Sequence, residues 1–188
     1  MERTYAAFRR SGAVILTTLI VTSAAAGQEA PQPPRADPAD VGSMDAIVEA
    51  LYAVISGPVG EARDWDRFRS LFIPEARLIP TGRGAAGNAS YRVLAPDDYI
   101  QANGQGLTSV GFMETEVART VETFGNVSHV FSTYESKFTR NGEPATARGI
   151  NSIQLFDDGS RWWIVSVFWD SERPDNPIPA KYLPGGSR

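Results

Sequence analysis

The residues of this chain that could carry out acid–base chemistry are few. The sequence contains one histidine, His129, and no cysteine, which excludes cysteine nucleophiles, cysteine-ligated clusters and zinc sites built on several histidines. Arg119, Tyr134 and Asp170 are the strongest other candidates, because a buried carboxylate can act as a general acid or base and an arginine or tyrosine can stabilise an enolate. They would serve a cofactor-independent isomerase, lyase or hydrolase without a metal. Asp170 could equally be solvated or paired with an arginine.

Four strand-like segments must position these residues. They are rich in β-branched and aromatic residues, and two of the three sequences between them, Asn-Gly and Asp-Gly, are typical of tight hairpins. The segments span residues 112–124, 127–140, 145–156 and 161–170, with turns at Gly125-Asn126, Asn141-Gly142 and Asp158-Gly159. We therefore expect a four-stranded antiparallel meander.

A row of polar residues crosses this predicted meander. If each turn contains two residues, one polar residue from each strand falls in the same row: Arg119, Ser132, Asn151 and Ser166. The same face is otherwise mainly apolar, and a polar row inside an apolar face is typical of a pocket floor. Asn151 is the best placed anchor because its amide offers both a donor and an acceptor. The candidate ligand-binding residues are Ser132, Asn151, Ser166, Phe168, Trp65 and Tyr99, the last two of which could instead belong to the core.

The opposite face of the meander combines charged and large apolar residues. His129 falls on this face, and Glu135 lies opposite Arg148 as an expected ion pair. A contiguous apolar patch is rarely exposed on a soluble monomer, so we expect a homodimer through this face. The patch consists of Trp163, Val165, Val167 and Trp169.

Helices are expected before the meander. Ser43 and Asp64 can cap two amphipathic helices, which end at Gly57-Pro58 and before Pro74. Helices packed on one face of a mainly antiparallel sheet make an α+β fold. A third helix and two short strands are expected at residues 96–103, 76–80 and 91–94.

This order of elements resembles the nuclear-transport-factor-2-like or SnoaL-like superfamily. The similarity covers Ser43 to about Glu172 and is most specific in residues 64–78 and 159–169. Residues 124–135 and 169–183 are also similar to uncharacterised exported bacterial members. The resemblance implies a cone-shaped α+β fold, in which three N-terminal helices pack on a curved, mainly antiparallel sheet around a deep pocket, frequently in a homodimer.

The resemblance does not imply one activity, because this fold hosts isomerases, cyclases, dehydratases and proteins that only bind. In the steroid isomerase branch the general base is an acid on the first strand. The matching residues 76–80 of this chain contain no carboxylate. That mechanism is therefore not expected here.

The two ends of the chain are predicted to lie outside the folded domain. Three arginines, an apolar run from Gly12 to Val21 and then Ala24-Ala25-Ala26 form a signal-peptide pattern with cleavage after Ala26. The pattern favours the Sec route over the twin-arginine route and predicts a periplasmic or secreted protein. The expected organisation is a signal peptide at 1–26, a proline-rich linker at 27–40, the cone domain at 41–172 and an irregular tail at 173–188.

Composition narrows the possible partners. The 188 residues are 42% hydrophobic and carry a formal charge of -4, which argues against nucleic-acid binding through phosphate neutralisation. No membrane contact is expected after signal cleavage. Three functions stay open: binding of a small apolar or amphiphilic molecule, cofactor-free catalysis in the same pocket, and a dimeric structural or interaction module whose pocket is filled by its own side chains. The first agrees best with the polar row.

Overall fold

A computed structural model describes residues 32–84 and 87–186 of the chain. The predicted signal peptide, at residues 1–26, lies outside these residues. Within them, no helix is long and apolar enough to cross a membrane.

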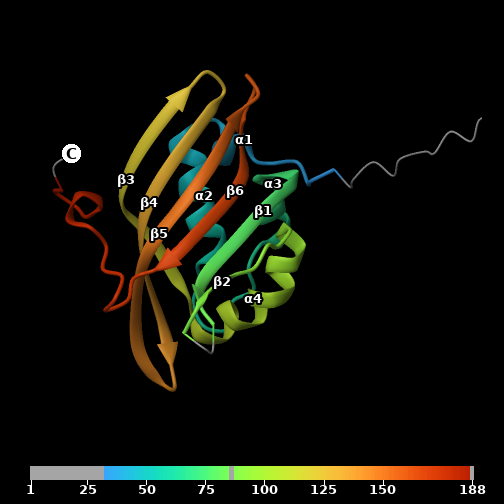
Figure 1. The fold of residues 1–188 in the computed structure, drawn as a ribbon. Coiled ribbons are helices and arrows are strands. Elements are labelled where there is room, and N and C mark those ends of the chain that lie inside the picture. Colours follow the sequence, from blue (N-terminus) through green and yellow to red (C-terminus); the bar gives the residue numbers. More distant parts are fainter. Residues whose placement is uncertain (1–31, 85–86, 187–188) are drawn as a thin grey trace, which may run out of the picture. The chain divides into compact units, whose positions relative to one another are not determined.

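The described residues form helices packed against one six-stranded sheet (Figure 1). The strand order is β2-β1-β6-β5-β4-β3, in which β1 is parallel to β6 and the other neighbours are antiparallel. The predicted α+β fold is confirmed. The helices are α1 (Pro38–Val41), α2 (Met44–Ile55), α3 (Trp65–Ser70), α4 (Pro96–Val110) and the 3-10 helix η1 (Ala180–Tyr182). The strands are β1 (Phe72–Arg83), β2 (Ala89–Tyr91), β3 (Met113–Phe124), β4 (Val127–Arg140), β5 (Glu143–Asp157) and β6 (Trp162–Ser171).

The predicted helix starts are confirmed. The Ser43 side chain accepts a hydrogen bond from the backbone N–H of Ala46, and Asp64 caps α3 in the same way. The buried face of α2 contributes Ile47 and Leu51 to the core. Helix α4 continues past Asn103, where the prediction ended it, and stops at Gly111, whose φ is 63°.

A short helix precedes the predicted start of the domain. Asp37 caps α1, and both Asp40 carboxylate oxygens accept hydrogen bonds from Arg67, at 2.7 and 2.8 Å. The prediction that the linker continues to residue 40 is therefore wrong at its end. Proline at the first helical position starts this turn instead of breaking it.

The first two predicted hairpin registers are confirmed. Tight turns join Phe124 to Val127 and Arg140 to Glu143, and Asn141 and its following glycine both have the positive φ that a type I′ turn requires. The predicted pairing of Arg119 with Ser132, and of Ser132 with Asn151, is also present.

The third hairpin differs from the prediction. Its strands pair from Asp157 and Trp162, so the loop holds four residues, which the Asp158 carboxylate stabilises by accepting hydrogen bonds from the backbone of Ser160 and Arg161. Val165 is then an extra residue in β6, because the register shifts there. This bulge moves every later side chain of β6 to the opposite face.

Because of the Val165 bulge, Asn151 lies opposite Trp169 and Ser166 lies opposite Gln154. Ser166 and Phe168 are therefore on the face away from the helices, and the prediction that they lie in the pocket facing the helices is wrong. Val167, which the sequence placed on the outer face, is 4% exposed in the core.

A second bulge lies in β3. Ala118 pairs with Thr133 but Glu116 pairs with Tyr134, so Val117 is the extra residue. The bulge turns the preceding alternate residues, Glu114 and Glu116, toward the helices. Strict alternation from the predicted turn would have placed Glu116 on the outer face.

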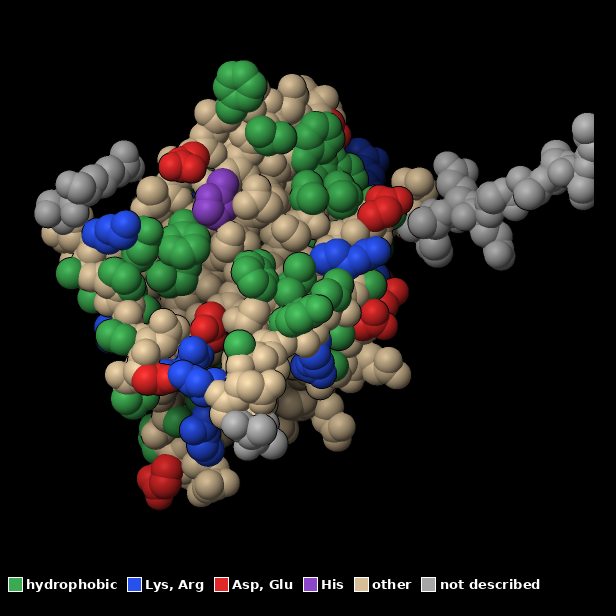
Figure 2. Space-filling view, in the orientation of Figure 1, with side chains coloured by type: hydrophobic (Ala, Val, Ile, Leu, Met, Phe, Trp, Pro, Cys, Tyr) green, Lys and Arg blue, Asp and Glu red, His purple; other side chains and the backbone are tan. Residues whose placement is uncertain are grey.

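The outer face of the sheet is covered in part by the chain's own C-terminal segment. Thr133 donates a hydrogen bond to the carbonyl oxygen of Tyr182, whose ring packs on Phe131 with centroids 4.9 Å apart. Figure 2 shows this face, with His129 as the histidine among scattered apolar side chains. The tail contains η1 and a buried Ile178. The prediction of an irregular tail therefore missed η1, but residues 173–179 and 183–186 form no helix or strand.

Two predictions about the outer face are corrected. Val167 and Trp169 point inward, so the proposed dimer patch keeps only Trp163 and the bulged Val165; homodimer formation itself stays a prediction. Glu135 and Arg148 are cross-strand neighbours, but their ion-pair partners differ from the expected ones. Those ion pairs are Glu135 with Lys137 and Arg148 with Glu172.

A buried arginine connects the helix ends. Arg63 is 7% exposed, and its guanidinium donates to backbone carbonyls on both sides of the helical layer. The acceptors are Ile55, Gly57, Glu61 and Leu107, at 2.6 to 3.2 Å. No side chain of any other type presents that many donors in one plane.

We expect Arg63→Met to lower the free energy of unfolding by about 3 kcal/mol, because several buried carbonyl oxygens lose their donors. Urea denaturation followed by circular dichroism measures the loss. Arg92→Met is the matched control, since the Arg92 side chain is exposed. Equal stability of the two variants would contradict the assigned role of Arg63.

Candidate functional site

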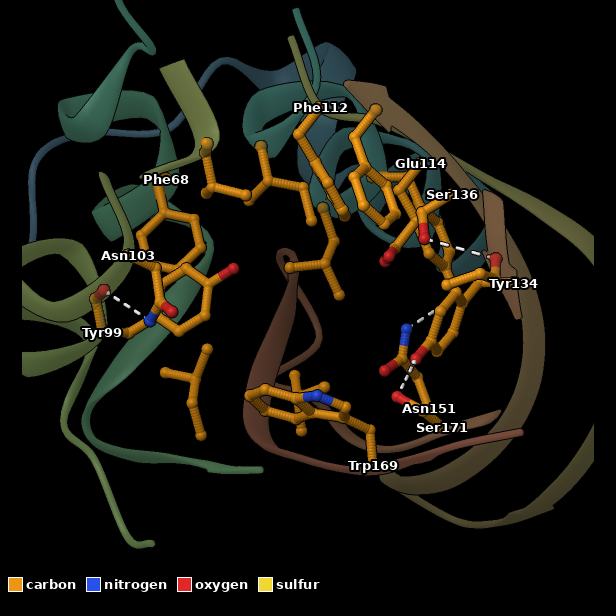
Figure 3. A pocket seen from close by; sticks show the side chains of 18 residues that line it. Phe68, Tyr99, Asn103, Phe112, Glu114, Tyr134, Ser136, Asn151, Trp169 and Ser171 are labelled. Carbon is orange, nitrogen blue, oxygen red and sulfur yellow. Dashed lines mark hydrogen bonds between the residues drawn. The ribbon is translucent and has the colours of Figure 1, made fainter. Parts of the chain in front are cut away.

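A cavity of about 280 Å³ lies between the helices and the inner face of the sheet (Figure 3). Most of its wall is apolar and aromatic. Helix α2 contributes Leu51 and Ile55, and the nearly parallel rings of Tyr99 and Phe68 stack with centroids 5.4 Å apart. The remaining apolar lining residues are Leu78, Leu107, Phe112, Phe138, Ala147, Val167 and Trp169.

A chain of hydrogen bonds forms the polar side of this cavity. Asn151 Nδ2 donates to the Tyr52 hydroxyl at 3.0 Å, and this hydroxyl lies 2.7 Å from the hydroxyl of Ser132. Ser132 donates to Glu116 Oε2 at 2.8 Å. The other oxygen of that carboxylate accepts from Arg119. The chain therefore connects the cavity to the edge of the sheet.

The Glu116 end of these hydrogen bonds determines which group donates in each of them. The ion-paired Glu116 carboxylate only accepts, so Ser132 gives its single proton to Glu116. Tyr52 must then donate to Ser132 and accept from Asn151. This assigns the nitrogen of the Asn151 amide to Tyr52 and leaves its oxygen on the cavity side, as Figure 3 shows.

Glu114 is the ionisable carboxyl group in the cavity wall. Burial among the apolar side chains raises the pKa of Glu114 to about 7, against the smaller opposing effect of a hydrogen bond from Asn151. Ser56, at the end of α2, fixes the strand there: its hydroxyl donates to the carbonyl oxygen of Tyr52 and accepts from the backbone N–H of Glu114. A carboxyl group with this pKa exchanges its proton near neutral pH.

Three tyrosines surround Glu114 from different elements. Burial raises the pKa of Tyr134 on β4 to about 12, and it raises the pKa values of Tyr52 on α2 and Tyr99 on α4 as well. All three hydroxyls therefore stay protonated at neutral pH. They can donate hydrogen bonds but cannot supply negative charge.

The structure brings together only part of the predicted site. Tyr134, Asn151 and Tyr99 line the cavity, and Ser132 lies one hydrogen bond behind it. Trp65 packs on Gly104 of α4, where an added Cβ would lie 3.1 Å from its ring, so it serves helix packing and does not line the cavity.

The predicted catalytic group is not assembled. Asp170 is on the outer face, where hydrogen bonds from Arg173 lower its pKa. Arg119 lies at the sheet edge in ion pairs with Glu116 and Asp45. Only Tyr134 of the three contacts the cavity. The Val165 bulge turns Asp170 away from it. Asp170 and Phe168 instead line a separate cavity of about 440 Å³ under the C-terminal tail.

His129 lies on the outer face, as predicted, and its Nε2 is 2.9 Å from the hydroxyl of Ser152. Among residues 32–84 and 87–186, no group of three or more histidine, cysteine, aspartate or glutamate residues is placed to hold a metal ion.

Sequence reasoning missed Glu114 and Glu116. The bulge that turns them inward occurs at Val117, between residues that continue a regular alternation on either side. Neither glycine nor proline marks the position. The adjacent sequence therefore contains no signal for the change, by which the inward residues are even-numbered before Val117 and odd-numbered after it.

Comparisons with known proteins identify the architecture. No protein-family model matches the chain. No curated protein matches it in sequence either. Solved structures do match, at low sequence identity.

Three of these structures come from bacteria. A protein from Xanthomonas campestris, assigned as a calcium/calmodulin-dependent protein kinase II association domain, has a TM-score of 0.52 and 13% identity, covering 69% of this chain and 86% of its own. A nuclear transport factor 2-like superfamily protein from Salmonella enterica has a TM-score of 0.50 and 16% identity, covering 70% and 87%. An uncharacterised protein with a cystatin-like fold from Caulobacter vibrioides has a TM-score of 0.50 and 14% identity, covering 71% and 90%. The fold of this chain is therefore the nuclear-transport-factor-2-like fold, as its order of elements predicted.

Proposed function

We propose that the protein binds a small, mainly apolar molecule in the cavity between α2, α4 and the inner face of the sheet. The observation that carries the proposal is the pairing of an aromatic wall with polar groups that face the cavity, Glu114 and the oxygen of Asn151. Binding sites for small molecules combine these two features, since the apolar wall supplies affinity and the few polar groups supply orientation.

Burial of Glu114 is costly for folding alone. Taking a carboxylate out of water without a cation beside it destabilises the folded protein. A leucine at this position would fill the same wall without that cost. The retained carboxyl group therefore supports a ligand-binding role for the cavity over a filled structural core.

We expect Ala147→Phe to abolish binding of a neutral apolar probe, because Ala147 lines the cavity and a phenyl ring there would occupy its volume. Fluorescence titration with N-phenyl-1-naphthylamine measures the binding. Thr146→Phe is the matched control, since the neighbouring Thr146 points to the outer side of the same strand. Equal binding by both variants would place the probe elsewhere and contradict the proposal.

A second candidate function is acid–base catalysis in the same cavity. It is favoured by the pKa of Glu114, which is suited to proton exchange at neutral pH. Glu114, and not Asp170, would be the general base, with the Tyr134 hydroxyl as a hydrogen-bond donor to the reacting molecule. This candidate requires that Glu114 titrates near neutral pH.

Titration of Glu114 has a measurable effect on stability. Its folded-state pKa lies above the ordinary value of 4.5, so the wild type loses stability as the pH rises from about 4.5 to about 7. We expect Glu114→Gln to be more stable than the wild type by up to about 3 kcal/mol near pH 8.5 and equal to it near pH 4.5. Chemical denaturation at both pH values tests this. The exposed Glu122 on the same strand gives the control Glu122→Gln, and a pH-independent difference for Glu114→Gln would rule out the assigned titration.

We also propose that the protein acts outside the cytoplasm, on the strength of the signal-peptide pattern in residues 1–26. Expression of the full chain in a Gram-negative host should give a periplasmic product that begins at Gly27. Mass spectrometry of the intact product measures its N-terminus. A cytoplasmic product that retains residues 1–26 would contradict the proposal.

A further inference from the structure

Amide and carboxyl oxygens face the cavity beside the hydroxyl groups of its tyrosines. The fixed direction of the chain through Tyr52 leaves Asn151 Oδ1 facing the cavity. Asn103 Nδ2 donates to the carbonyl oxygen of Tyr99, which leaves Asn103 Oδ1 as a second acceptor. Ser136 donates to the carbonyl oxygen of Ala147. A ligand that brings donors of its own can therefore form hydrogen bonds with these oxygens.

The charge of the cavity has one sign. Glu114 lines it, and within residues 32–84 and 87–186 no lysine, arginine or histidine does. The other ionisable groups in its wall are Tyr52, Tyr99 and Tyr134, which face Glu114 from three different elements. Arg119, the closest cation on the same strand, is held by Glu116 and Asp45 at the sheet edge. An anionic ligand would meet a like charge without compensation.

The wall suits a cation. The ring of Trp169 lies beside Asn151 on the neighbouring strand, and the rings of Phe68 and Tyr99 line the other side of the cavity (Figure 3). Aromatic faces attract organic cations, and they do so more strongly where water is excluded. A positive charge would also stabilise the ionised form of Glu114, whose burial is otherwise unfavourable.

Resting on the proposed binding function, we infer that the ligand is a small apolar amine, bound as an ammonium ion whose N–H groups donate to the Glu114 carboxylate and to Asn151 Oδ1. The apolar body of the amine lies against the aromatic wall. Neutral alcohols supply one donor and no charge, so they bind more weakly. Carboxylic acids of the same shape are excluded by Glu114.

The test compares three compounds of matched shape: 1-naphthylmethylamine, 1-naphthalenemethanol and 1-naphthoic acid. Each is used to displace N-phenyl-1-naphthylamine, a neutral probe, from the full chain at about pH 7.5. We expect the amine to bind about tenfold more tightly than the alcohol, because charge-assisted hydrogen bonds are stronger than neutral ones. The acid should not displace the probe.

The variant Glu114→Gln assigns the preference to the carboxylate. We expect the ratio of the alcohol and amine dissociation constants to fall to about one in this variant and to be retained in Glu122→Gln, on the outer side of β3. The inference is overturned if the alcohol or the acid binds as tightly as the amine, or if Glu114→Gln leaves the ratio unchanged. In either case, binding of the probe would still support the proposed function. If the probe does not bind the wild type at all, both fail. Should Glu114→Gln not fold, the three compounds on the wild type decide the question.

Discussion

The interior of this protein depends on two interruptions in the alternation of its strands. A regular strand places successive side chains on opposite faces, and one extra residue reverses the assignment of everything beyond it. The bulge at Val165 brings Trp169 into the cavity and removes Asp170 from it. The bulge at Val117 brings Glu114 in. The character of the cavity, aromatic with one carboxyl group, therefore results from two single-residue insertions.

The two inward glutamates of β3 have different environments. Glu116 is paired with Arg119 and accepts from Ser132, so its charge is compensated at the sheet edge. Glu114 lies two residues nearer the start of β3, where burial raises its pKa. The hydrogen-bond chain between them fixes Tyr52 and Asn151 in one orientation. Glu116, whose charge is compensated, thus helps to orient the polar groups near Glu114, whose charge is not.

Local signals predicted the elements well and the site poorly. Ser43, Asp64 and the Asn141 turn act through hydrogen bonds or backbone angles within a few residues, so their effects can be read from the adjacent sequence. A bulge is set by packing against strands and helices that are distant in sequence. The register was therefore right for Ser132 and Asn151, which lie between the two bulges, and wrong for Ser166 and Asp170, which lie beyond one of them.

The position of the Glu114 carboxyl group differs from that of the catalytic acid in the steroid isomerase branch, the site that the resemblance would suggest first. In the steroid isomerase branch the acid belongs to the first strand, but β1 of this chain directs Leu78 into the cavity and leaves Glu75 exposed. The carboxyl group here comes from β3, on the far side of the sheet order from β1. A ligand oriented by Glu114 would therefore be held from a different wall of the cavity. The fold does not determine which strand carries the carboxyl group. The chemistry of the ligand therefore has to be inferred from Glu114, Asn151 and the aromatic rings of the cavity.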